Sequence, residues 1–285
     1  MKRDVLWRIE ETVMRVLMIG ATALALGCLA LILGAVVWKG LPAMSLAMVT
    51  QCPQGGYYTG AGGGILNAIL GSLYLAVGAT LVALVLGLPI ALYLQLYAGR
   101  SRLIEFVRLA LDVLWGIPSI VYGAFGFGLM LLIGLRASLL GGILALSLVE
   151  LPIMCRAIEE VLKMVPFELT ESAYALGTTR WEVAWKVVVR QALPGITSAI
   201  LLAFGRGIGD AASVLFTAGY TDHLPTSPLR PVASLPLAVF FQLATPFPSV
   251  QQRAYASALV LTAIVLIISV LARLASTRLS RFVVK

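Results

Sequence analysis

Two residues of opposite charge lie close together in an apolar run and could bind an anion. Arg206 and Asp210 are the only charged residues between positions 191 and 221, and a spacing of four places both on one face of a helix. A guanidinium group offers a planar set of donors that matches phosphate oxygens, and it stays protonated at physiological pH. Asp210 could accept a hydrogen bond from the protonated oxygen of hydrogen phosphate, which a fully ionised oxyanion such as sulfate cannot donate. These two residues are our candidates for a substrate pathway.

The same pair also has a structural interpretation. Charged groups inside a bilayer cost several kcal/mol unless they are paired or face water, so Arg206 and Asp210 could simply neutralise each other. Gly205, Gly207 and Gly209 surround the pair and allow close helix approach or a break in the helix. The sequence leaves the structural and the functional interpretation open.

A charged segment interrupts the apolar chain between residues 157 and 192. Pro166 can begin a helix, Gly177 can end it, and Thr179 followed by Glu182 has the capping-box pattern that begins a second helix. Such an amphipathic helix pair either lies at the lipid headgroups or docks a partner. The face expected to pack comprises Trp181, Ala184, Trp185, Val188, Val189 and Ala192, and the wet face comprises Glu182, Lys186 and Arg190.

The remaining residues of chemical interest favour structural roles. Glu150 is expected to reach the membrane interface or to pair with Arg156. His223 is expected to be a solvated loop residue. Pro118 and Pro89 are predicted to kink their helices and could act as hinges.

Several kinds of chemistry are not expected in this chain. Cys28, Cys52 and Cys155 fall in separate predicted segments, so we predict neither a disulfide nor a metal site. No lysine follows a glycine, so the chain contains no P-loop for nucleotide phosphates. No nucleophile is accompanied by a base, and we predict no catalytic residue.

The composition identifies the environment of these residues as a membrane. Of 285 residues, 60% are hydrophobic and 12% are charged, and the mean hydropathy is +0.98. A span needs about 20 apolar residues, which predicts a single all-α domain over residues 1–285 with six spans. The predicted spans are about 16–38, 65–94, 110–135, 137–155, 193–217 and 254–274.

The order of the charges predicts orientation. The formal net charge is +8, but most of the 21 basic residues fall in segments that lie on one side of the six predicted spans. We therefore expect both termini and residues 157–192 in the cytoplasm, and we do not expect nucleic acid as a partner. The first apolar run is too long for a cleaved signal peptide, so we expect it to stay in the membrane. The proline-rich outer loop, residues 220–253, cannot be one helix, but its stretch LPLAVFFQLA could form a short helix sheltered from lipid.

Several motifs resemble a known transporter family. ESAYALG, followed by a basic helix and LPGI, resembles the EAA loop of ABC-importer permeases, which docks into a groove of an ATPase subunit. GIPSIVYGAFG, LPIMCRAIEEVLKMVP and RGIGDAASVLFTAG are similar to stretches of the PstA family, the A-type permeases of phosphate-specific ABC transporters. The resemblance implies a six-span permease with the type I importer fold.

The resemblance also implies roles for individual residues. Glu171, Ala173 and Gly177 match the acidic, alanine and glycine positions of the motif that couples the permease to the ATPase. The chain departs from the family pattern at three places, which are Ser172 for a usual alanine, Val189 with Arg190 for a usual Leu-Pro, and Asp210 for a usual glutamate. Arg206 would give phosphate a transient foothold in the pathway.

The implied assembly is larger than this chain. It comprises a homologous PstC-like permease, two PstB-like ATPases that bind ATP and Mg, and a PstS-like extracytoplasmic phosphate-binding protein, all at the lipid bilayer. The chain itself would hold no cofactor. The alternatives are a permease for another oxyanion such as sulfate or molybdate, an ion-gradient-driven anion transporter or channel, and a membrane subunit that signals phosphate status.

Overall fold

The fold is helical, as the sequence predicts. The structure, a computed structural model, describes residues 2–54, 62–98 and 101–279, and within these ranges no strand occurs beyond an isolated bridge between Pro53 and Gly63. Five helical segments are long and apolar enough to cross a membrane, or six if one bent helix pair is counted as a span. The helices are α1 (Lys2–Gly40), η1 (Leu41–Ala43), α2 (Leu46–Thr50), α3 (Leu66–Leu92), η2 (Tyr93–Tyr97), α4 (Arg102–Gly116), α5 (Ser119–Leu132), α6 (Leu139–Lys163), α7 (Phe167–Ala175), α8 (Arg180–Glu182), η3 (Val183–Val188), α9 (Val189–Ile208), α10 (Leu235–Leu243) and α11 (Pro248–Leu279).

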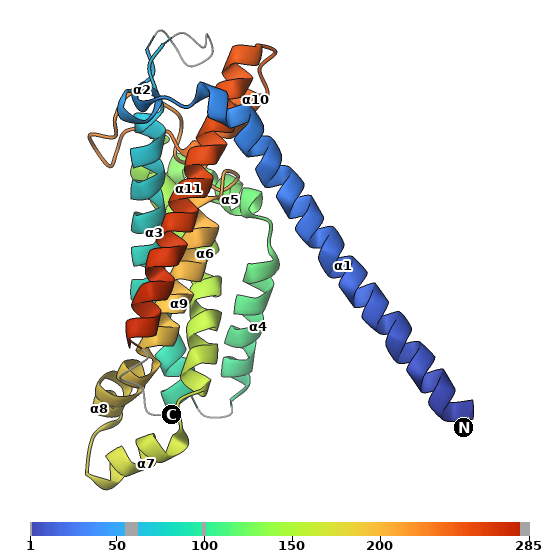
Figure 1. The fold of residues 1–285 in the computed structure, drawn as a ribbon. Helices are drawn as coiled ribbons and strands as arrows, with labels where there is room; N and C mark the ends of the chain where they lie inside the picture. Colours follow the sequence, from blue (N-terminus) through green and yellow to red (C-terminus); the bar gives the residue numbers. More distant parts are fainter. Residues whose placement is uncertain (1, 55–61, 99–100, 280–285) are drawn as a thin grey trace.

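The core is built by α3, α6 and α9, with α11 packed alongside (Figure 1). Ala83 of α3, Met154 of α6 and Ala203 of α9 are buried in one apolar cluster. Small residues allow this close approach, since a Cβ added at Gly87 would lie 3.1 Å from the Met154 side chain. The three helices therefore form a rigid wall against which the charged residues are placed.

The third predicted span, 110–135, is two helices rather than one. α4 and α5 meet at Pro118 with a bend of 101°. Pro118 has no backbone N–H, and the residue before it, Ile117, is extended with φ −71° and ψ 131°, as a proline requires of its predecessor. Pro89 behaves differently, because α3 continues past it to Leu92. The two prolines that we named as possible hinges thus have unlike local structures.

Two other spans differ in length from the prediction. α6 continues beyond residue 155 to Lys163, so the connection that we expected to begin at 157 begins later, before α7. α9 ends at Ile208 instead of continuing to 217, because three glycines of low helix propensity flank its last turn and the Asp210 carboxylate caps the next turn. Residues 209–218 are turns and not helix.

The short helix expected in the outer loop is confirmed as α10. Ser234 caps its first turn, and the N–H of Leu235 donates to the Ser72 hydroxyl of α3 at 2.7 Å. Leu235 and Leu237 are fully buried. The rest of the fold therefore shelters this helix, as its apolar sequence requires.

α1 lies apart from the helical bundle. Figure 1 shows it leaving the bundle near η1 and running away from the other helices, and its most apolar window is 0% buried by the rest of the chain. Its contact with α11 lies near Gly40, where an added Cβ would lie 2.7 Å from the carbonyl oxygen of Tyr255. The apolar surface of α1 is therefore not covered by this chain.

Candidate functional site

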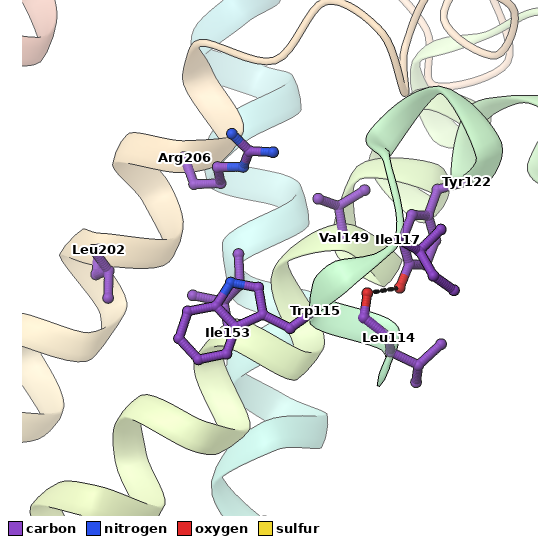
Figure 2. A pocket seen from close by; sticks show the side chains of 8 residues that line it. All are labelled: Leu114, Trp115, Ile117, Tyr122, Val149, Ile153, Leu202 and Arg206. Carbon is purple, nitrogen blue, oxygen red and sulfur yellow. Dashed lines mark hydrogen bonds between the residues drawn. The ribbon is translucent and has the colours of Figure 1, made fainter. Parts of the chain in front are cut away.

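Arg206 is exposed and lines an open cavity on one side of the helical bundle. The cavity measures about 370 Å³ and lies where the bend between α4 and α5 meets α6 and α9. Figure 2 shows the Arg206 guanidinium reaching from α9 toward the side chains of the bend. Within the described ranges its guanidinium makes no hydrogen bond and no ion pair. The lining residues are Leu114, Trp115, Ile117, Tyr122, Val149, Ile153, Leu202 and Arg206.

The wall opposite Arg206 is held in place by hydrogen bonds across the bend. The Tyr122 hydroxyl donates to the carbonyl oxygen of Leu114 at 2.7 Å and so ties α5 to the last turn of α4 (Figure 2). The one charged group that lines the cavity is the Arg206 guanidinium, and the other lining side chains are apolar or aromatic. Such a cavity can offer a bidentate site for an oxyanion.

Asp210 does not share a helix face with Arg206. α9 ends before it, and its carboxylate accepts hydrogen bonds from the Ser119 hydroxyl at 2.9 Å and from the N–H of Ser213 at 3.3 Å. Among the described residues no ion pair joins Arg206 to Asp210. The interpretation in which the two residues neutralise each other is therefore wrong. The carboxylate instead holds the beginning of α5 against the end of α9.

Glu150 is part of this region, which the sequence did not indicate. Its side chain is fully buried between α3, α6 and α9, where one oxygen accepts a hydrogen bond from the Thr80 hydroxyl at 2.8 Å. The other oxygen occupies the space that a Cβ at Gly207 would need. Both expectations for Glu150, reaching the interface or pairing with Arg156, are wrong. Gly207, the residue after Arg206, is the sequence feature that could have indicated a close approach of another group to α9.

An ionic cluster lies about one helical turn away from the cavity along α4 and α6. Arg156 donates two hydrogen bonds of 2.6 Å to Asp112 of α4 and one of 2.7 Å to Glu159. The Glu159 carboxylate is fully buried and also lies 2.8 Å from Arg108 of α4. The cluster joins α4 to α6 across a sequence separation that no local pattern reveals.

The charged connection forms the helix pair that its caps predict. α7 begins after Pro166, Gly177 has a φ of +79°, and the capping box of Thr179 and Glu182 is present in full. The left-handed φ explains the glycine, because a side chain is strained in that conformation. Glu171 is exposed and Ala173 is buried.

The packed face of the second helix agrees with the prediction except at Trp181. Val183, Ala184 and Val188 are buried, whereas Trp181 is 65% exposed and its ring contacts that of Trp185 at a tilt of 58°. The turn over Val183–Val188 is π-helical, which changes the angle between successive side chains and rotates Trp181 away from the core. With Leu176, which is 85% exposed, it leaves apolar side chains uncovered at this end of the chain.

Comparison with known proteins accounts for this arrangement. Residues 83–285 match the family described as the binding-protein-dependent transport system inner membrane component. The chain is 37% identical over 268 residues to the phosphate transport system permease protein PstA of Yersinia pestis, covering 94% of this chain and 90% of that protein. This chain belongs to the PstA family of binding-protein-dependent membrane permeases. A second PstA relative, from Xylella fastidiosa (strain 9a5c), is 35% identical and covers 90% of this chain and 92% of that protein.

Solved structures agree on the fold. A chain of the inward-facing methionine ABC transporter MetNI superposes with a TM-score of 0.61 at 18% identity, covering 78% of this chain and 96% of that chain. The PstA-family chain thus has the type I importer permease fold, and it is a multi-pass membrane protein. The residues that we singled out all lie within the part that matches the family: Pro89, Pro118, Glu171, Ala173, Gly177, Arg206 and Asp210.

Proposed function

We propose that this chain is the permease subunit of an ATP-driven importer and forms half of the pathway by which inorganic phosphate enters the cell. The observation that carries the proposal is the Arg206 guanidinium, which lines this open cavity and has no hydrogen-bond or ion-pair partner in the described chain. A cation at that depth is costly unless it serves a wet cavity or a ligand. The relatives' name, phosphate transport system permease protein PstA, supports phosphate as that ligand.

In this proposal Arg206 gives the anion a transient foothold. Its planar donors would bind two phosphate oxygens. The other side chains that line the cavity are apolar or aromatic, so few further hydrogen bonds would slow the release of phosphate. Asp210 would support the site by holding α5 in position. Its carboxylate, which already accepts hydrogen bonds from Ser119 and Ser213, has acceptor sites left that could receive a hydrogen bond from hydrogen phosphate.

The motor of the transport cycle would lie in other subunits. Two PstB-like ATPases would bind ATP and Mg, and one of them would dock on α7, Gly177 and α8, where Glu171 and the uncovered Leu176 and Trp181 lie. This chain would hold no cofactor and would not be an enzyme. A PstC-like permease would supply the second half of the pathway, and a PstS-like protein would deliver phosphate from outside. Both termini would lie in the cytoplasm.

The backbone offers a direct link between the docking surface and Arg206. α8, η3 and α9 form one helical segment from Arg180 to Ile208, so Arg206 lies on the same segment as the capping box. A displacement of α7 and α8 by closure of the ATPases would therefore move the Arg206 side chain relative to α6. Ala173 is buried against this segment and would transmit the displacement.

The test is uptake of labelled phosphate into proteoliposomes that hold the complete complex, with the binding protein and ATP on opposite sides. We expect ATP-dependent uptake of phosphate and not of sulfate, and its loss in Arg206→Ala. Transport of sulfate or molybdate in place of phosphate would identify another oxyanion permease. Uptake that follows an ion gradient without ATP would refute the importer assignment.

A further inference from the structure

A second groove runs along the outside of the bundle between α9 and α11. It measures about 810 Å³, and Arg206 lies at its boundary with the cavity described above. α9 and α11 lie side by side in Figure 1. The groove is lined by Ser198, Leu201, Leu202, Gly205, Arg206, Ser269, Ala272, Arg273, Ser276 and Thr277.

The charged residues that line this groove are all basic. It contains two guanidinium groups, those of Arg206 and Arg273, and none of the described residues that line it is acidic. Neither arginine makes a hydrogen bond or ion pair with the described part of the chain. Two like charges beside a low-dielectric helix pair repel each other, so the groove favours an anion.

The two arginines lie at different depths along the groove. The Ser276 hydroxyl donates to the carbonyl oxygen of Pro194 at 3.3 Å, which places these two residues at the same level on neighbouring helices. From that level Arg206 lies twelve residues along α9 and Arg273 three residues back along α11. At about 1.5 Å per residue the two arginines are separated by roughly 13 Å along the helix axes.

One hydroxyl group in the groove can donate a hydrogen bond to a ligand. The hydroxyls of Ser198, Ser276 and Thr277 donate to backbone carbonyls. Ser269 makes no hydrogen bond in the described ranges, and it lies one turn from Arg273 on the side toward Arg206. A guanidinium and a hydroxyl on one helix face are donors that bind phosphate oxygens.

We propose that Arg273 and Ser269 form a second oxyanion subsite, where phosphate that has left Arg206 is held before it leaves the groove. This inference rests on the proposed function and deepens it. The groove extends from the cavity at Arg206 toward the end of α11 that we place in the cytoplasm, so the subsite lies on the exit side. With two separate cationic subsites, the anion can bind to each in turn, and neither needs to bind it so tightly that release is prevented.

A phospholipid headgroup carries the same phosphate chemistry and could be the ligand of Arg273. The continuity of the groove with Arg206 favours the free anion, because a headgroup fixed at the membrane surface would not follow the groove to Arg206, roughly 13 Å further along the helix axes. The experiment therefore compares vesicles with and without anionic lipid.

Phosphate uptake is measured for Arg273→Gln, Arg273→Lys and Ser269→Ala in the complete complex. The matched control is Arg102→Gln, which removes an exposed basic residue that lies outside the groove. We expect Arg273→Gln to lower the maximal uptake rate at least fivefold with an unchanged half-saturating concentration of binding protein, and Arg273→Lys to retain more activity. The loss should be equal in vesicles of purely zwitterionic lipid. A loss confined to anionic vesicles, or one equal to that of Arg102→Gln, would overturn the proposal.

A labelling measurement separates this inference from the substrate assignment. Ser269→Cys is introduced into a chain with Cys28→Ser and Cys52→Ser, since the remaining Cys155 is buried. We expect the anionic methanethiosulfonate reagent to react faster than the cationic one, and Arg273→Gln to lower this ratio at least threefold. Millimolar inorganic phosphate should slow the reaction. An unchanged ratio in Arg273→Gln refutes the subsite even if phosphate is transported, and a changed ratio without phosphate uptake refutes only the proposed substrate.

Discussion

Arg206 and Arg156 illustrate how differently two arginines of one membrane protein are placed. The planar guanidinium of Arg156 donates two hydrogen bonds to Asp112 and forms an ion pair with Glu159, so the protein balances its charge. Arg206 faces a cavity and has no such partner among the described residues. A charge that the fold leaves unbalanced is available to a ligand, whereas a balanced one stabilises the fold.

The planar shape of the guanidinium group predicts the effect of a conservative substitution at Arg206. Arg206→Lys keeps the charge but replaces the planar set of donors with one compact ammonium group. We expect phosphate uptake at least tenfold below wild type, with assembly and ATP hydrolysis by the complex retained. Uptake kinetics in proteoliposomes check this. Wild-type rates in the lysine variant would mean that a point charge is sufficient.

Gly207 and Glu150 make a second prediction at the residue scale. In Gly207→Ala the new Cβ would overlap the buried Glu150 carboxyl, which must move away from α9. Forcing an extra methyl group into a packed site costs about 1–3 kcal/mol of folding free energy. Thermal unfolding of the purified complex should show the loss.

Gly205→Ala is the matched control, because the space around Gly205 is open and the residue lies on the same helix. Equal thermal stability of the two alanine variants would contradict the close packing of Glu150 on α9.

At the scale of elements, α4 and α6 are joined by buried charge in addition to apolar packing. Glu159 neutralises Arg156 and Arg108 at once while its own carboxylate is fully buried. Glu159→Gln would leave the basic residues facing one another near a buried position. Arg156 would keep Asp112 and Arg108 is partly exposed, so we expect a fall in thermal unfolding temperature that corresponds to less than the about 3–5 kcal/mol lost when a fully buried pair is broken.

The neighbouring residue provides the comparison for this variant. Glu160 is exposed and pairs with Lys163 at 2.7 Å on the surface, where an ion pair contributes little. Glu160→Gln should therefore unfold close to the wild-type temperature. If both variants unfold at the same temperature, the buried Glu159 carboxylate is not what stabilises the contact between α4 and α6.

The turn at Gly177 predicts a selective loss of coupling. Its φ of +79° suits glycine and is tolerated by asparagine but not by a β-branched residue. Because an added Cβ meets no atom within 4 Å, the strain in a variant comes from the backbone alone. We expect Gly177→Val to insert normally but to lose most ATP-dependent uptake, while Gly177→Asn retains it. Normal uptake in the valine variant would count against the coupling role of this turn.

At the scale of the whole molecule, the described chain has a well-packed core and two surfaces that it does not cover. The core helices α3, α6 and α9 bury their side chains against one another, but α1 and the α7–α8 region present apolar groups outward. Large uncovered apolar groups mark contacts with lipid or protein. The chain is therefore built as a part of an assembly.

Hydrogen exchange of the complete complex can locate the ATPase contact. Removing the ATPase subunits should speed amide exchange across residues 167–182, because Leu176 and Trp181 lose their cover and the short helices fray. Exchange in α3 and α6 should not change. Unchanged exchange across 167–182 would place the ATPase contact elsewhere.

The sequence by itself determined the features that depend on neighbours along the chain. The apolar lengths of the spans, the capping box of Thr179 and Glu182, and the turn at Gly177 all follow from residues within a few positions of one another. The resemblance of the charged segment to a coupling loop likewise indicates the family without any tertiary information.

Only the tertiary structure decided which distant groups meet. Thr80 binds Glu150 across 70 positions, Ser119 binds Asp210 across 91, and Arg156 binds Asp112 across 44. A helical repeat reports which residues share a face, but it carries no information on which other helix that face contacts. Asp210 is therefore bound to Ser119, and the guanidinium of Arg206 faces the cavity, because of how the helices pack.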